Sequence, residues 1–161
     1  MKKHAVLLCF LVGASIMLHG CQQTPPMRPV PEAALTYLSF NESSSYFKRV
    51  QNYEFRLEEG KANAFFWLAN EEEPYAVPVD QEWMNTLTGF IRQYGLMGWD
   101  GFNGSASGLL DGTRFEMDFS FADGTAVHAS GYGKFPGNYG EASSAIDAHF
   151  VQLLPGEMRD W

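Results

Sequence analysis

Residues Arg114–Thr125 read RFEMDFSFADGT and contain the clearest strand signal in the chain. Their apolar side chains alternate with polar ones, which is the period-two pattern of a strand with one buried face. These apolar positions are Phe115, Met117, Phe119 and Phe121. The Asp-Gly pair that follows favours a tight hairpin turn. We therefore predict that residues 125–131 return as an antiparallel partner strand.

The same logic extends in both directions. Residues 53–57 alternate, a turn with Gly60 follows, and residues 62–68 form the returning strand of a first hairpin. Asp80 is a suitable helix N-cap, and an apolar stripe at helical spacing runs from Trp83 to Tyr94. A second helical stripe runs over residues 142–154 and ends at Pro155-Gly156.

The segments between these elements, residues 70–78 and 98–112, are expected to be loops. The predicted fold class is α+β: two ββα units form a four-stranded antiparallel sheet with two helices packed on one face. Hairpins followed by helices do not provide the crossovers of a parallel sheet.

The start of the chain has the layout of a secretory signal. Lys2 and Lys3 precede an apolar run over residues 5–18, which ends in Leu18-His19-Gly20-Cys21. A cysteine at this place resembles the lipobox of bacterial lipoproteins, although His19 departs from the usual small or hydroxyl residue. The alternatives are an ordinary secretory peptide or an uncleaved anchor, and the apolar run is short for a membrane span.

This resemblance implies cleavage before Cys21 and acylation of its thiol and new N-terminus. It implies a lipid-anchored location in the cell envelope, with the bilayer as a partner. In enteric-type Gram-negative sorting, Gln22 in place of aspartate favours the outer membrane, facing the periplasm.

Three parts of the chain follow from this interpretation. Residues 1–20 are the signal peptide, 21–34 are the lipidated cysteine with a proline-rich tether, and 35–161 are a single α+β domain. The formal charge of −8 becomes −8 − 2 = −10 once the two signal lysines are removed. An acidic body of this kind disfavours nucleic acid as a partner. Cys9 would leave with the signal, so no disulfide pair is expected.

No catalytic or metal-binding signature stands out, and no cofactor is predicted. His128 is expected to point away from the core and His149 to lie on the apolar stripe of the last helix. Glu116 and Asp118 share one strand face, so a paired-carboxylate site is conceivable, but a solvated sheet face is the simpler interpretation. The Asp-Gly pairs fit turns better than calcium loops.

The most suggestive cluster is aromatic. Glycine-rich segments on either side of the second hairpin carry five rings that could bind a sugar or anchor a protein partner, or plug the end of the sheet. These candidate binding residues are Trp99, Phe102, Tyr132, Phe135 and Tyr139.

A second resemblance covers the C-terminal half, from Trp83 onward. The short motifs that carry it are Trp99-Asp100-Gly101-Phe102, Leu110-Asp111-Gly112-Thr113, Phe121-Ala122-Asp123-Gly124 and Gly131-Tyr132-Gly133-Lys134-Phe135-Pro136. Together they resemble a set of uncharacterised bacterial lipoproteins, which brings no activity with it.

The functional prediction is a membrane-anchored envelope module that binds a protein or glycan partner without catalysis. The alternative is a small envelope hydrolase or inhibitor domain. Convergence of His128 with Asp111, Glu116 or Asp118 would favour the alternative. A purely structural assembly subunit is a third hypothesis.

Overall fold

The computed structural model describes residues 28–44, 51–67, 72–109 and 111–159. Seven strands form one mixed sheet in the order β4-β3-β2-β1-β6-β7-β5. Neighbouring strands are antiparallel, except that β5 runs parallel to β7. The strands are β1 Leu35–Ser43, β2 Gln51–Glu58, β3 Lys61–Phe66, β4 Tyr75–Pro78, β5 Asn103–Ser105, β6 Arg114–Phe121 and β7 Ala126–Tyr132.

The α+β class and both predicted hairpins are confirmed, but the four-stranded antiparallel sheet is wrong. The two hairpins do not meet directly, because β1 lies between β2 and β6 and pairs with both. Strand β4 forms inside the predicted loop 70–78, and β5 forms inside the predicted loop 98–112. These extra strands pair with segments distant in sequence or lie at a sheet edge, where local patterning is weak.

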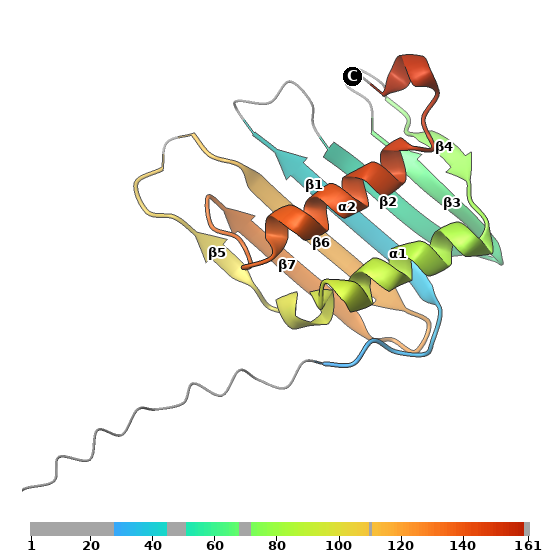
Figure 1. Ribbon diagram of the computed structural model, residues 1–161, viewed down its shortest axis with the longest axis horizontal. Coiled ribbons are helices and arrows are strands. Elements are labelled where there is room, and N and C mark those ends of the chain that lie inside the picture. The colour runs from blue at the N-terminus through green and yellow to red at the C-terminus, as the bar shows by residue number, and fades with distance from the viewer. Residues whose placement is uncertain (1–27, 45–50, 68–71, 110, 160–161) are drawn as a thin grey trace, which may run out of the picture.

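Both helices cover the same face of the sheet (Figure 1). Helix α1, Gln81–Gln93, begins at Asp80, whose side chain accepts a hydrogen bond from the Trp83 amide at 2.9 Å. This is the expected N-cap. Helix α2, Tyr139–Val151, crosses β6, β1 and β2 in Figure 1. Short 3₁₀ helices, η1 Leu96–Trp99 and η2 Gly156–Met158, follow the two α-helices.

The core lies between the sheet and the helices and is rich in aromatic rings. Phe150 of α2 stacks on Tyr53 at 5.0 Å between ring centroids and meets Trp83 edge-on at 5.1 Å. Around Phe115, at the other end of the helical layer, a second group of rings gathers. Burial of apolar side chains from the helices and the central strands therefore stabilises the domain.

The opposite face of the sheet carries no helix in the part of the chain that the structure describes. The register places Glu54, Ser39 and Asp118 side by side on β2, β1 and β6, with His128 next to Asp118 on β7. We call this surface the open face. Its edges are blunted, since β4 ends in Pro78 and β5 has three residues.

Candidate functional site

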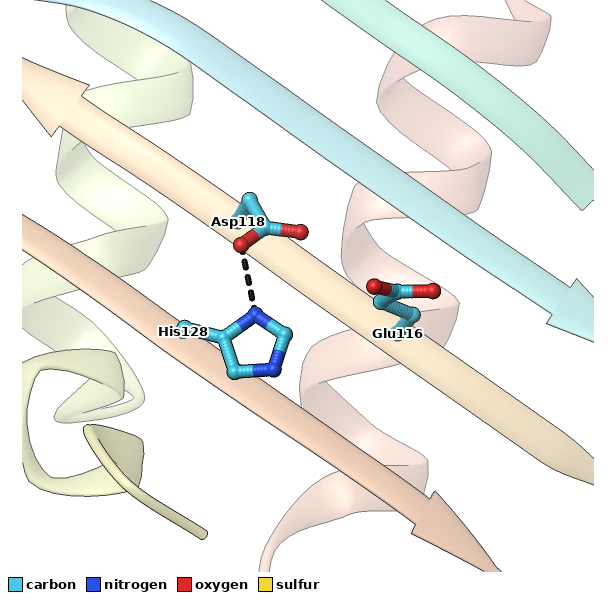
Figure 2. Close-up of side chains that lie close together, drawn as sticks. All are labelled: Glu116, Asp118 and His128. Carbon is cyan, nitrogen blue, oxygen red and sulfur yellow. Dashed lines mark hydrogen bonds and ion pairs between the residues drawn. The ribbon is translucent and has the colours of Figure 1, made fainter. Parts of the chain in front are cut away.

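The open face brings together three ionisable side chains that alternation had placed on one side of their strands. Asp118 and His128 are direct cross-strand partners on β6 and β7, and Glu116 lies two residues along β6. His128 Nδ1 is 2.6 Å from Asp118 Oδ1. Figure 2 shows Asp118 and Glu116 on β6 and the His128 ring on neighbouring β7, with Nδ1 of the ring facing Asp118. One donor atom from each of the three lies within 4.8 Å of the others.

The charges around His128 favour its protonated form. The hydrogen bond with Asp118 raises the pKa of His128, and the negative charges of Asp118, Glu116 and Asp100 act in the same direction. The side chains of His128 and Asp118 remain 56% and 37% exposed. Water and salt therefore screen the pair, which adds little to the stability of the fold.

Asp100, which lies between η1 and β5, makes two hydrogen bonds next to this site. Its Oδ1 accepts a hydrogen bond from the His128 backbone amide at 3.3 Å, and its Oδ2 accepts one from Arg28 at 2.8 Å. Asp100 thus links Arg28 to the strand residue that pairs with Asp118. A hollow of about 400 Å³ lies next to Asp118 and His128, and its lining includes Tyr37, Asp100 and Ser120. The site is open to solvent and has space beside it.

The predicted aromatic residues do not form one surface. Trp99 and Tyr139 are buried, with ring centroids 5.9 Å apart, and Phe102 and Phe135 are half-buried against the same core. Their common neighbour is Phe115. In the folded chain four of the five rings therefore close one end of the core.

Tyr132 differs from the other four. It pairs with Arg114 on the adjacent strand, and the Arg114 guanidinium lies 5.8 Å from the centroid of the tyrosine ring. By strand alternation Tyr132 shares the open face with His128, and it is half-buried. The open face thus keeps one of the predicted binding residues.

His149, unlike His128, is buried. It lies on the floor of a groove of about 690 Å³ between α1 and α2, stacked on Trp83 at 4.4 Å between ring centroids. Its Nε2 donates to the Trp83 carbonyl at 3.0 Å, and its Nδ1 accepts from the Gln152 amide at 2.9 Å. Burial lowers the pKa of His149. Both ring nitrogens have partners, so His149 is a neutral structural residue.

Other predicted positions lie apart from this site. Asp111 is exposed in the β5–β6 loop and does not belong to the group of three donors. Cys21, together with the signal and the first half of the tether, lies outside the described residues. Within the described ranges, no helix is long and apolar enough to cross a bilayer.

The sequence contained a signal for the His128–Asp118 contact. If Asp123 is the centre of the hairpin turn, positions 118 and 128 are equally distant from it, and the register pairs them. Alternation alone placed both outward but did not pair them. Comparisons of the chain with protein-family models and with curated proteins found no match.

Proposed function

We propose that this chain is a lipid-anchored protein of the bacterial cell envelope whose domain binds a protein or glycan partner without catalysing a reaction. The observation that carries the proposal is the open face, a broad polar surface that the helices leave uncovered. A polar sheet face needs no cover for stability, so it is available to a partner.

The path of the chain supports this arrangement. Residues 28–34 lead into β1 at the same end of the sheet as the Asp123 turn, where the Ala122 amide donates to the Ala34 carbonyl at 2.8 Å. A lipid on Cys21 would attach the domain through this end. The open face would then stand beside the tether and remain accessible from the periplasm.

The side chains on the open face suit polar partners. Arg56 lies 5.0 Å from the centroid of the Phe65 ring and donates to Glu54 at 2.7 Å, so two neighbours orient its guanidinium. On the other side of β1, the Arg114 guanidinium likewise lies over the Tyr132 ring. Oriented guanidinium groups, carboxylates and partly exposed rings are the groups that bind sugars and peptide surfaces.

A small envelope hydrolase is the second candidate, and the His128–Asp118 contact is the observation that favours it. A histidine oriented by a carboxylate is the arrangement of a general base. The His128 and Asp118 side chains, however, are 56% and 37% exposed, so that water reaches the pair. A binding role therefore fits the exposure of the pair better.

Site-specific photo-crosslinking in cells tests the proposal. The full-length, anchored protein carries a photoreactive residue at Asn41 on the open face or, as a control, at exposed Gln93 on α1. The expected result is one crosslinked protein or glycan species from position 41 that is absent from position 93. Equal crosslinking from both positions, or none from position 41, would contradict the open-face assignment.

Anchoring is tested separately with Cys21→Ser. The natural chain should fractionate with membranes and incorporate labelled palmitate, whereas the variant should do neither. A Cys21→Ser chain that still incorporates the label would rule out this cysteine as the acylation site.

A further inference from the structure

The geometry of Glu116, Asp118 and His128 goes beyond a generally polar surface. Their donor atoms already lie within 4.8 Å of one another, and His128 and Asp118 are at 2.6 Å. Two donors on one tetrahedral zinc ion lie about 3.3–3.6 Å apart, given metal–ligand distances of about 2.0–2.2 Å. Small rotations of exposed side chains would bring the three donors to this spacing, while the β6–β7 register holds their backbones in place.

The kinds of donor narrow the choice of ion. Calcium and magnesium prefer sites made of oxygen ligands alone, whereas an imidazole nitrogen suits first-row transition metals such as zinc. One imidazole and two carboxylates provide three protein ligands, which leaves a fourth tetrahedral position open. The exposed side chains of Asp118 and His128 leave this position accessible to water or to a partner's donor group.

The surroundings leave the donors available. Glu116 makes no hydrogen bond or ion pair with any residue that the structure describes. Among the cations on this side of the sheet, Arg56 pairs with Glu54, Arg28 with Asp100, and Arg114 lies over the Tyr132 ring. The three side chains therefore lie in a region with an excess of negative charge. Asp100 holds the backbone of His128 in place beside them.

We propose that Glu116, Asp118 and His128 bind one divalent transition-metal ion, with Zn²⁺ the best match, on the open face. The fourth coordination position faces outward, where a carboxylate, phosphate or imidazole of a partner could complete it. This inference goes beyond the proposed partner binding, because binding of the ion alone can be measured without any partner.

Isothermal titration calorimetry with Zn²⁺ alone tests the site, using the full chain in detergent micelles without a polyhistidine tag. The expected result is one ion per chain, and at least a tenfold loss of affinity in each of Glu116→Gln, Asp118→Asn and His128→Gln. Glu58→Gln is the matched control, because it removes one negative charge from the same face at the far end of β2. It should leave the affinity within twofold.

A second measurement needs no variant. In NMR spectra of the natural chain, one equivalent of Zn²⁺ should shift the ring nitrogen signals of His128 and leave those of buried His149 unchanged. Absence of binding, or an unshifted His128 ring, would overturn the proposal. It would also fail if Glu58→Gln weakened binding as much as Asp118→Asn, since binding would then reflect diffuse negative charge. None of these failures would touch the crosslinking result from position 41.

Discussion

The covered and open faces of the sheet are built from the same strands but hold their side chains by different means. Along β6, Phe115 and Met117 point into the core, while Glu116 and Asp118 point to the open face. The covered side chains are fixed by ring packing on several sides, and the open ones by single polar contacts to a neighbouring strand. One face therefore supplies most of the packing, whereas the other is held by contacts that add little to stability.

The strongest way to test this division is to truncate Phe115. Its ring contacts those of Trp99, Phe102, Phe135 and Tyr139, and its side chain is fully buried. Phe115→Ala should lower the free energy of unfolding by about 3–5 kcal/mol, because it removes a buried ring and leaves a cavity. Urea unfolding measures this loss.

The matched control is the next residue on the same strand. Glu116→Ala should change the free energy of unfolding by no more than about 0.5 kcal/mol, because the side chain is exposed and makes no hydrogen bond or ion pair with the described residues. Similar losses in the two variants would show that the open face carries as much of the stability as the covered one.

A glycine beneath the aromatic cluster gives the next largest effect. A Cβ atom at Gly131 would collide with the Lys134 carbonyl oxygen and lie 2.6 Å from a Phe115 ring carbon. Gly131→Ala should therefore cost about 1–3 kcal/mol in unfolding free energy, because the backbone or the ring must shift.

Gly137 is the comparison position, since a Cβ atom there meets nothing within 4 Å. Gly137→Ala should leave the urea midpoint nearly unchanged. If the two alanines were equally tolerated, the close packing of residues 131–135, at the end of β7 and beyond it, against Phe115 could not be what limits residue 131 to glycine.

The two faces also differ in how much of them the sequence predicts. Alternation and the Asp123-Gly124 turn predict the β6–β7 hairpin, and with it the outward direction of His128, because a hairpin is encoded locally. Strand β1 is harder to predict. Its strict alternation is short, since the register shifts between Leu35 and Tyr37, and its partners lie in two separate hairpins.

The aromatic residues show the second limit of sequence patterns. Trp99 and Tyr139 are adjacent to glycines, which is compatible with a binding loop and with a tightly packed end of the core. Only the pairing of β5 with β7 and the docking of α2 bring these two rings together. Burial of this kind depends on tertiary contacts, which composition and spacing do not contain.

A smaller effect is expected from the cap of α1, the helix that supplies Trp83 and Leu87 to the covered face. Asp80→Ala removes the acceptor of the Trp83 amide and should cost about 1 kcal/mol. Chemical unfolding with Gln93→Ala, an exposed change near the other end of the helix, provides the reference. If Asp80→Ala and Gln93→Ala had the same free energy of unfolding, water would replace the Asp80 cap without any loss of stability.

The smallest effect, and the sharpest comparison, uses the two histidines. The pKa of His149 is lowered in the folded chain, so below about pH 6.5 the unfolded chain takes up the proton first and stability falls with acidification. The pKa of His128 is raised, so its contribution is present below about pH 6.5 and is lost as the pH rises through its folded value.

Urea unfolding between about pH 5 and about pH 8 separates these contributions. Relative to His149→Gln, the natural chain should lose stability as the pH falls; relative to His128→Gln, it should gain a little. Asp80 and Glu82 line the groove of His149, and burial lowers the pKa of His149 more than the hydrogen bond to the Trp83 carbonyl raises it. Asp118, Glu116 and Asp100 face His128 with little burial to oppose them. Opposite signs would follow from the burial of His149 and from the carboxylates that face exposed His128, whereas equal signs would mean that helix cover is not what separates the two faces.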